Sequence, residues 1–293
     1  MILVTGGAGV MGSRLVKGLV YRGYKVRVLT LPGDPKASLL DDVDCEIVYG
    51  DVSDADSIEA IFLDIRTVEI VYGDVSDADS IEAIFLDIRT VYHLASVIIA
   101  QDPEIINRVN VQGTRNVVGG AGTAGVGHFV YVSSASVTWP EGSDYARSKL
   151  AAEKIVMSQR TMSWTIVRPT LTYGRDEGQE FMLFMDYLKK SPVVPFIGRG
   201  QAKRDPVLAD DVVSGLLKIA GNPQAYGKIY NFSGGEEISI WELAKLMLKV
   251  RGMTRVLLPI PVPVCHRLRH GKDHETPAFE QLWHQQDPSR SGP

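Results

Sequence analysis

The chain is poor in features that several classes of protein require. Among its 293 residues there are only two cysteines, Cys45 and Cys265, which lie far apart and match no metal-ligand or redox spacing. This argues against a disulfide scaffold and suits a reducing compartment. Lys plus Arg total 31 against 35 Asp plus Glu, a net charge of -4, so no basic excess is available to bind a nucleic acid backbone. We therefore expect no nucleic acid partner.

The sequence also has no long apolar run, and we expect no targeting leader. No stretch approaches the roughly 18 to 20 uncharged apolar residues that cross a bilayer. Residues 1–4 carry no basic leader and run directly into a glycine turn. We expect a cytoplasmic protein without a membrane span, long enough for one large or two modest domains.

Short β-branched runs alternate with longer amphipathic stretches in the first part of the chain. This alternation predicts an α/β fold, a doubly wound parallel sheet (Rossmann) with helices on both faces. Beyond Pro169 the pattern loosens, with proline and glycine loops and helices near 210–220 and 240–250. The predicted organisation is a Rossmann domain over 1–169, a smaller C-terminal lobe over 170–264, and a poorly ordered tail over 265–293. The strands are expected at 2–5, 25–30, 46–49, 91–95, 128–133 and 164–168.

An internal duplication interrupts this pattern. Residues 46–68 recur without a change as residues 69–91. Two identical copies are not a solenoid, because repeat proteins drift and need about three or more units to bury a core. We interpret the segment as a tandem duplication of one strand-helix unit, which an open sheet accommodates as an extra β-α unit.

The tail holds four of the six histidines. His266, His270 and His274 have a spacing that one helix face would share, but Gly271 interrupts that helix and no carboxylate or thiolate stands at a matching offset. We expect a solvated tail and no metal site.

A glycine-rich turn, Thr5 to Gly12, follows the first strand and opens a helix. This context is the one that a dinucleotide fingerprint requires. Glycines here permit the tight turn and let the backbone approach a pyrophosphate, while the helix N-terminus supplies free N–H donors and a positive dipole. The predicted contacts are Gly6, Gly9, Val10, Met11 and Gly12.

The end of the second predicted strand bears on the choice of nucleotide. An acidic residue there would bind the adenosine ribose of NAD, and an arginine would accept the 2′-phosphate of NADP. The chain has Thr30 and Leu31, so neither signal is present. The absence of a basic clamp favours NAD, and NADP stays open.

Tyr145 and Lys149 stand four residues apart and share one face of a predicted helix. A cation beside the phenol, helped by a positive nicotinamide ring, lowers the tyrosine pKa from about 10 and makes the phenolate a usable general base. The pair is common on helix surfaces, but this one follows a buried strand that ends in Ser133 and Ser134.

These features together resemble the extended short-chain dehydrogenase/reductase family, the NAD-dependent epimerase/dehydratase group, over roughly residues 1 to 250. The order of the motifs along the chain is specific to it. They are the glycine turn, Gly50-Asp51-Val52 (again at Gly73-Asp74-Val75), His93-Leu94-Ala95, Asn110 to Thr114, Ser133-Ser134, Tyr145 to Lys149, Arg168-Pro169-Thr170, Asp210-Asp211-Val212 and Tyr230-Asn231-Phe232.

The resemblance implies a role for each matching residue. Tyr145 would be the base, Lys149 would lower its pKa and hold the nicotinamide ribose, and Ser134, the second serine of its pair, would orient the substrate. An aspartate of the Gly-Asp-Val motif would contact the adenine, and either copy supplies one. The remaining cofactor positions are Thr30, Asp51 or Asp74, and Ala95. The C-terminal lobe over 170–264 would be the substrate lobe.

Departures from the family pattern narrow the activity. Dehydratases of the family carry an Asp-Glu pair where this chain has Ala135 and Ser136, which disfavours dehydration, and the usual Val-Tyr-Gly reads Val137-Thr138-Trp139. We expect NAD(P)-dependent chemistry at a carbinol carbon. A nucleotide-sugar epimerase comes first and a hydroxysteroid or ketone dehydrogenase second, with a non-catalytic NAD(P)-binding assembly or sensor protein as the rival. A homodimer is compatible with this interpretation.

The duplication leads to a first prediction. One strand, one adenine-contacting Asp and one helix suffice between the second strand and Val91, and the first copy is expected to pair beside the second strand with Asp51 at the adenine. Deleting residues 69–91 should leave a protein that binds nucleotide at least as well and melts no lower, because an added edge strand exposes unpaired N–H and C=O groups. Thermal melting and nucleotide titration check this. An insoluble or non-binding product would show that the duplication has become part of the fold.

Overall fold

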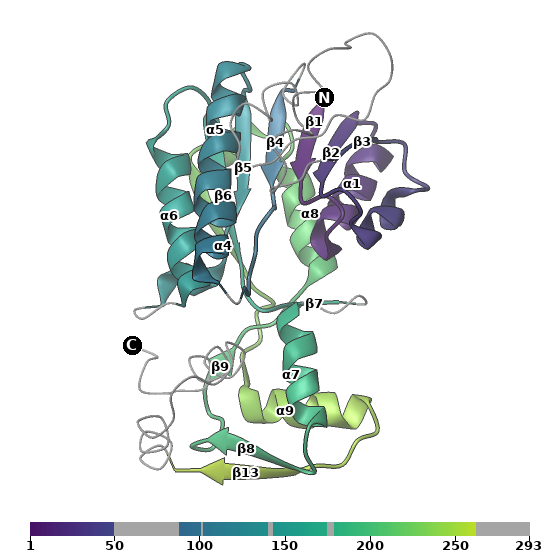
Figure 1. The fold of residues 1–293 in the computed structure, drawn as a ribbon, viewed down its shortest axis with the longest axis vertical. Helices are drawn as coiled ribbons and strands as arrows, with labels where there is room; N and C mark the ends of the chain where they lie inside the picture. Colours follow the sequence, from purple (N-terminus) through teal and green to yellow (C-terminus); the bar gives the residue numbers. More distant parts are fainter. Residues whose placement is uncertain (50–87, 101, 140–142, 175–178, 262–293) are drawn as a thin grey trace. The chain divides into compact units, whose positions relative to one another are not determined.

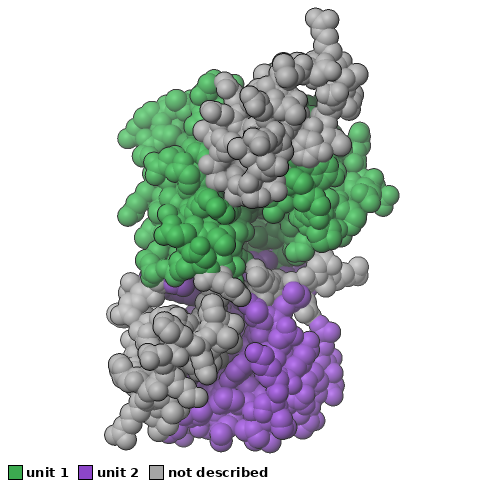
Figure 2. Space-filling model, in the orientation of Figure 1, with its two compact units in different colours: residues 1–137, 144–169, 209–232 green, residues 138–143, 170–208, 233–293 purple. Residues whose placement is uncertain are grey.

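The structure is a computed structural model that describes residues 1–49, 88–100, 102–139, 143–174 and 179–261. The chain forms two compact units (Figure 2). Unit 1 contains residues 1–137, 144–169 and 209–232, and unit 2 contains 138–143, 170–208 and the chain from 233 on.

Unit 1 is built on a seven-stranded sheet in the order β11-β6-β5-β4-β1-β2-β3, and every neighbouring pair is parallel. The predicted doubly wound parallel sheet is therefore confirmed. The strands are β1 (Ile2–Thr5), β2 (Val26–Thr30), β3 (Glu46–Tyr49), β4 (Thr90–His93), β5 (His128–Val132), β6 (Ser163–Pro169) and β11 (Lys228–Phe232).

The central strands are buried on both faces, as their continuous apolar sequences predict. Every residue of β1 and β5 is buried. Figure 1 shows α4, α5 and α6 grouped on one side of this sheet and α1 and α8 on the other. The helices of unit 1 are α1 (Val10–Tyr21), α4 (Pro103–Asn107), α5 (Thr114–Thr123), α6 (Asp144–Ser158) and α8 (Ala209–Ile219), with a π-helical segment, Arg108–Gly113, between α4 and α5.

The boundary predicted at residue 169 is only partly correct. After a first excursion into unit 2 the chain returns, so that α8 packs on α1 and β11 extends the main sheet beside β6. Gly18 makes the helix contact close, because a Cβ there would lie 2.7 Å from a methyl of Leu217. Arg14 on α1 also pairs with Asp210 at 2.6 Å. The pairing of α8 with α1 is a long-range packing choice that local patterning does not encode.

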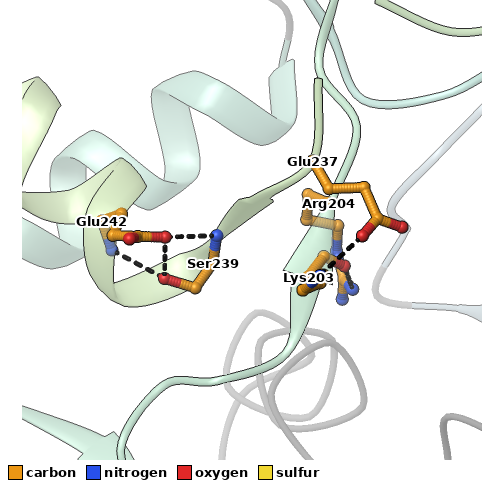
Figure 3. A network of polar contacts seen from close by, with 5 residues as sticks. All are labelled: Lys203, Arg204, Glu237, Ser239 and Glu242. Carbon is orange, nitrogen blue, oxygen red and sulfur yellow. Dashed lines mark hydrogen bonds and ion pairs between the residues drawn. The ribbon is translucent and has the colours of Figure 1, made fainter. Parts of the chain in front are cut away.

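Unit 2 has its own core around Phe184, Phe196 and Leu243. Helix α9 begins with a capping box, in which Ser239 and Glu242 exchange side chain and backbone hydrogen bonds. Next to it, Lys203 pairs with Glu237 at 2.8 Å (Figure 3). The elements are β7 (Thr172–Tyr173), α7 (Gln179–Lys189), β8 (Val193–Ile197), β9 (Lys203–Arg204), β10 (Val207–Leu208), β12 (Ile238–Ser239), α9 (Ile240–Val250) and β13 (Val256–Ile260).

The first copy of the duplicated segment begins as expected, because its first four residues form β3 and pair in parallel with β2. The rest of that copy and most of the second, with Asp51 and Asp74, lie outside the described residues, as does the histidine-containing tail. In the described ranges, no helix has the length and apolarity needed to cross a membrane, and no group of three His, Cys, Asp or Glu could hold a metal ion.

Candidate active site

The carboxyl ends of β1, β2 and β4 meet where the direction of the strand order reverses. Thr5 at the end of β1 is in register with Leu29 of β2 and His93 of β4. In open parallel sheets, ligands bind outside the strand ends at such a switch point. The glycine turn that leaves β1 lies at this position.

The turn is closed by backbone contacts that leave no space for side chains. Gly6 has a φ of 69°, and a Cβ there would lie 2.9 Å from the Ala95 nitrogen. A Cβ at Gly12 would lie 2.1 Å from the Gly6 oxygen. Gly9 is different, since its nearest such contact is 3.2 Å, again to the Gly6 oxygen. Gly6 and Gly12 are therefore needed for packing, and Gly9 leaves room for a ligand to approach the backbone.

The start of α1 presents backbone amides that find no acceptor within the helix. Gly9 is the N-cap residue, with no side chain to cap the helix, and the first turn holds no acidic residue. The amides of Val10, Met11 and Gly12 have no acceptor within the helix, because the first helical bond runs from the Ser13 amide to the Gly9 carbonyl. These donors and the helix dipole fit a pyrophosphate.

An acidic residue that the sequence analysis missed lies at the end of β2. Thr30 is buried, and its hydroxyl donates to a carboxylate oxygen of Asp34 at 3.3 Å. The other oxygen of Asp34 caps a short helix through the Lys36 amide. The sequence analysis considered only residues 30 and 31, whereas a Pro-Gly turn brings Asp34 back toward the strand. The signal that could have revealed it is Asp34 directly before Pro35, four residues after Thr30, because Asp is a common N-cap residue.

Lys149 lies in the interior of unit 1, where it is only 1% exposed. Its Nζ donates to the Val132 carbonyl at 2.7 Å and lies 4.4 Å from the ring centroid of Tyr131. Burial lowers the pKa of Lys149 to about 7, and the charge of Glu153 opposes that shift. The hydrogen bond joins α6 to the end of β5, two residues before Ser134.

Tyr145 stands one helical turn before Lys149 and is half-buried. Its carbonyl accepts from the Ser148 hydroxyl at 2.7 Å, and that hydroxyl in turn accepts from the Asn110 amide at 2.9 Å. The first turn of α6 is therefore held against the π-helical segment. Burial, and then the nearby Tyr145, raise the pKa of the Tyr131 phenol.

Ser134 and Ser133 differ in exposure. Ser133 is buried, while Ser134 is half-buried. The Ser134 Oγ lies 2.9 Å from the Ser136 Oγ and accepts from the Ser136 amide at 3.2 Å. This contact orients the Ser134 hydroxyl at the exit of β5.

Buried polar groups at the carboxyl ends of β1 and β4 form a chain of hydrogen bonds. His93 contacts the Thr5 hydroxyl at 2.7 Å through Nδ1 and the Thr114 hydroxyl at 3.0 Å through Nε2. Burial, and next the charge of Lys149, lower its pKa to about 3, so the imidazole is neutral. The Ala95 amide donates to the same Thr5 hydroxyl at 3.4 Å, which places Ala95 beside the glycine turn.

The fold and site define a dinucleotide-binding protein of the short-chain dehydrogenase/reductase class. A family model described as "NAD dependent epimerase/dehydratase family" matches residues 2–233. The chain belongs to this family, as the sequence motifs predicted.

Comparison with individual proteins gives several kinds of relative. The chain is 26% identical to a 3 beta-hydroxysteroid dehydrogenase/Delta 5-->4-isomerase of Mycobacterium tuberculosis, over 86% of this chain and 69% of the relative. It is 27% identical to a UDP-glucose 4-epimerase of Vibrio cholerae, over 58% and 57%. Among solved structures, a UDP-glucose 4-epimerase of Thermotoga maritima superposes with a TM-score of 0.67 at 21% identity, over 89% and 85%, a likeness of fold.

The geometry of the glycine turn generates a second prediction. Gly9→Val should leave the sheet intact, because a Cβ there meets only one atom at 3.2 Å, and should weaken NAD binding at least about tenfold, since a branched side chain would occupy the pyrophosphate position. Titration of NAD with circular dichroism as a fold control measures both. The matched control is Gly119→Val, on an exposed helical site with open space around its Cβ. Equal NAD affinity in parent and Gly9→Val would remove the turn from the cofactor site.

Proposed function

We propose that the protein catalyses NAD-dependent oxidoreduction at a carbinol carbon, with Tyr145 as the general base. The observation that carries this proposal is the placement of Lys149. A cation enclosed in the interior and one helical turn from a half-buried phenol is not a surface ion pair. Its charge acts at low dielectric and favours the phenolate of Tyr145.

The residues at the switch point fit NAD. Gly6, Gly9, Val10, Met11 and Gly12 would hold the pyrophosphate, since the turn offers a close backbone approach and unused amides. Ala95 would line the nicotinamide side, and Lys149 would contact the nicotinamide ribose. When bound, NAD supplies the acceptor for the hydride. Asp51 or Asp74 at the adenine stays a prediction.

The end of β2 supports NAD over NADP. The Asp34 carboxylate, held by the Thr30 hydroxyl, would accept hydrogen bonds from the adenosine ribose and repel a 2′-phosphate. Leu31 offers no charge to a phosphate. Thr30, the last residue of β2, would then act on the cofactor by holding the Asp34 carboxylate in place.

The chain's own residues would move the proton. Tyr145 takes the proton of the substrate hydroxyl, and the Ser134 hydroxyl, oriented by Ser136, donates to the substrate oxygen. Lys149 keeps the phenolate stable between turnovers. Ala135 and Ser136 bring no carboxyl group to this point, so elimination of water lacks an acid and a base of its own.

Two net reactions use this same step. Oxidation of a hydroxysteroid or another secondary alcohol is favoured by the relatives. The alignment with the hydroxysteroid dehydrogenase covers 86% of this chain at 26% identity, whereas that with the epimerase relative covers 58% at 27% identity. We place a dehydrogenase first on that ground and a nucleotide-sugar epimerase second. Recognition of the substrate by the chain beyond Pro169 stays a prediction.

The third prediction tests the base. Tyr145→Phe should lower kcat by about 10²-fold or more, because the proton acceptor is removed, while NAD affinity stays near that of the parent. Screening secondary alcohols and nucleotide sugars with both proteins provides the measurement. Tyr21→Phe, at a phenol 93% exposed on α1, is the control. Equal turnover by Tyr145→Phe and parent would reject Tyr145 as the base.

The fourth prediction separates the two net reactions. A dehydrogenase must release its reduced cofactor, whereas an epimerase keeps it for the return step. We expect the purified protein to release no stoichiometric NAD on denaturation and to exchange added NAD rapidly, as judged by mass spectrometry of the released small molecules. Tightly held, stoichiometric NAD would instead favour the epimerase.

A further inference from the structure

An ion pair whose carboxylate is fully enclosed lies one helical turn from Lys149, and the proposed chemistry does not use it. Glu153 follows Lys149 by one turn of α6, and its side chain is 0% exposed. Both carboxylate oxygens accept from the Arg168 guanidinium, at 2.8 Å from Nε and 2.6 Å from the second nitrogen. Arg168 belongs to β6, beside the strand that carries Val132.

Such a pair is costly unless something compensates for it. Replacing a buried ion pair by apolar residues is often neutral or stabilising, so stability alone is a weak explanation for Glu153. Lys149 presents a second cost, because the interior favours its neutral amine. Its hydrogen bond to the Val132 carbonyl is too little to offset the loss of water around a full charge.

The groups that face Lys149 come from four elements. His93 on β4 is neutral, and Tyr131 on β5 presents its ring to the ammonium. Arg168 on β6 is a cation, 18% exposed. On α6 itself stand Tyr145 and Glu153. As long as Tyr145 is protonated, Glu153 is the one anion among these groups. The charge of Glu153 raises the pKa of Lys149, against the effect of burial.

We propose that Glu153, held in place by Arg168, is a positioning residue that keeps Lys149 as an ammonium, so that the proton of the pair is lost from Tyr145. This inference rests on the proposed function of Tyr145 and Lys149. Arg168 cancels the effect of Glu153 only in part, because its side chain is 18% exposed and its charge is screened by solvent more than that of the carboxylate, which is 0% exposed.

The charge of Glu153 matters because Tyr145 and Lys149 titrate as a coupled pair. Phenolate with ammonium and phenol with amine contain the same number of protons, so pH alone does not select between them. A buried anion beside Lys149 favours the first form, which is the active one. Removing that anion shifts the population to phenol with amine. A change of one unit in the pKa of Lys149 changes the ratio of the two forms about tenfold.

The fifth prediction follows from this coupling. In Glu153→Gln, which keeps the shape and a hydrogen bond to Arg168, the ratio of the phenolate–ammonium form to the phenol–amine form should fall about tenfold for each unit by which the Lys149 pKa drops, and the Tyr145 phenolate at neutral pH should fall with it. Ultraviolet difference absorbance of tyrosinate measures it, with Tyr145→Phe in each background as the blank. The plateau of kcat against pH should fall equally, and its acid limb should move to lower pH because the first proton lost now comes from Lys149.

Control variants separate charge from structure. Glu153→Asp keeps the charge and should retain most of the phenolate, and Lys154→Gln, an exposed charge change at the next residue, should leave it unchanged. If Glu153→Gln does not fold, the double variant Glu153→Gln/Arg168→Gln replaces the ion pair by two amides and should show the same loss.

The outcomes distinguish this inference from the proposed function. A parent whose Tyr145 has a lowered pKa, together with a Glu153→Gln protein that melts lower but has the same Tyr145 titration, would overturn the positioning role alone. A parent in which Tyr145 titrates near pH 10 would overturn the proposed base and the inference with it. Loss of phenolate in Glu153→Gln with NAD affinity preserved supports both.

Discussion

The enclosed ammonium of Lys149 is the constraint on which the arrangement of the site depends. Its hydrogen bond to the Val132 carbonyl joins α6 to the end of β5, and so relates the helix that carries Tyr145 to the strand that leads to Ser134. Because a charge in the interior is unfavourable without compensation, the surrounding groups are arranged around it. The ring of Tyr131 and the charge of Glu153 lower the cost of that charge, and a neutral His93 adds no repulsion to it.

The nucleotide side of the site depends on backbone contact rather than on charge. Gly6 and Gly12 allow β1, α1 and the chain after β4 to approach within distances that a Cβ would prevent. The Thr5 hydroxyl then contacts both His93 and the Ala95 amide. The same packing that closes the turn brings Ala95 beside it, next to the start of α1, where the first amides have no acceptor within the helix.

Much of this could be predicted because the signals are local. The strands at 2–5, 46–49 and 128–132 follow from short apolar runs, and the glycine turn follows from its spacing between a strand and a helix. Two parts could not. The return of α8 and β11 to unit 1 depends on packing against α1 and pairing with β6, and Asp34 reaches the end of β2 only through a turn whose geometry the residue order does not specify.

The sequence by itself determined the parallel sheet and the family, because residue type and spacing along single elements suffice for these. Its assignment of the reactive groups stays a prediction. The tertiary structure decided the protonation states of the ionisable side chains at the site. In the sequence, Lys149, His93 and Glu153 are ordinary ionisable residues. In the folded chain all three are buried, and burial keeps the His93 imidazole neutral. Burial also lowers the pKa of Lys149, and the charge of Glu153 opposes that shift. Burial is a property of the assembled chain, and it sets the energy of every charge at this site.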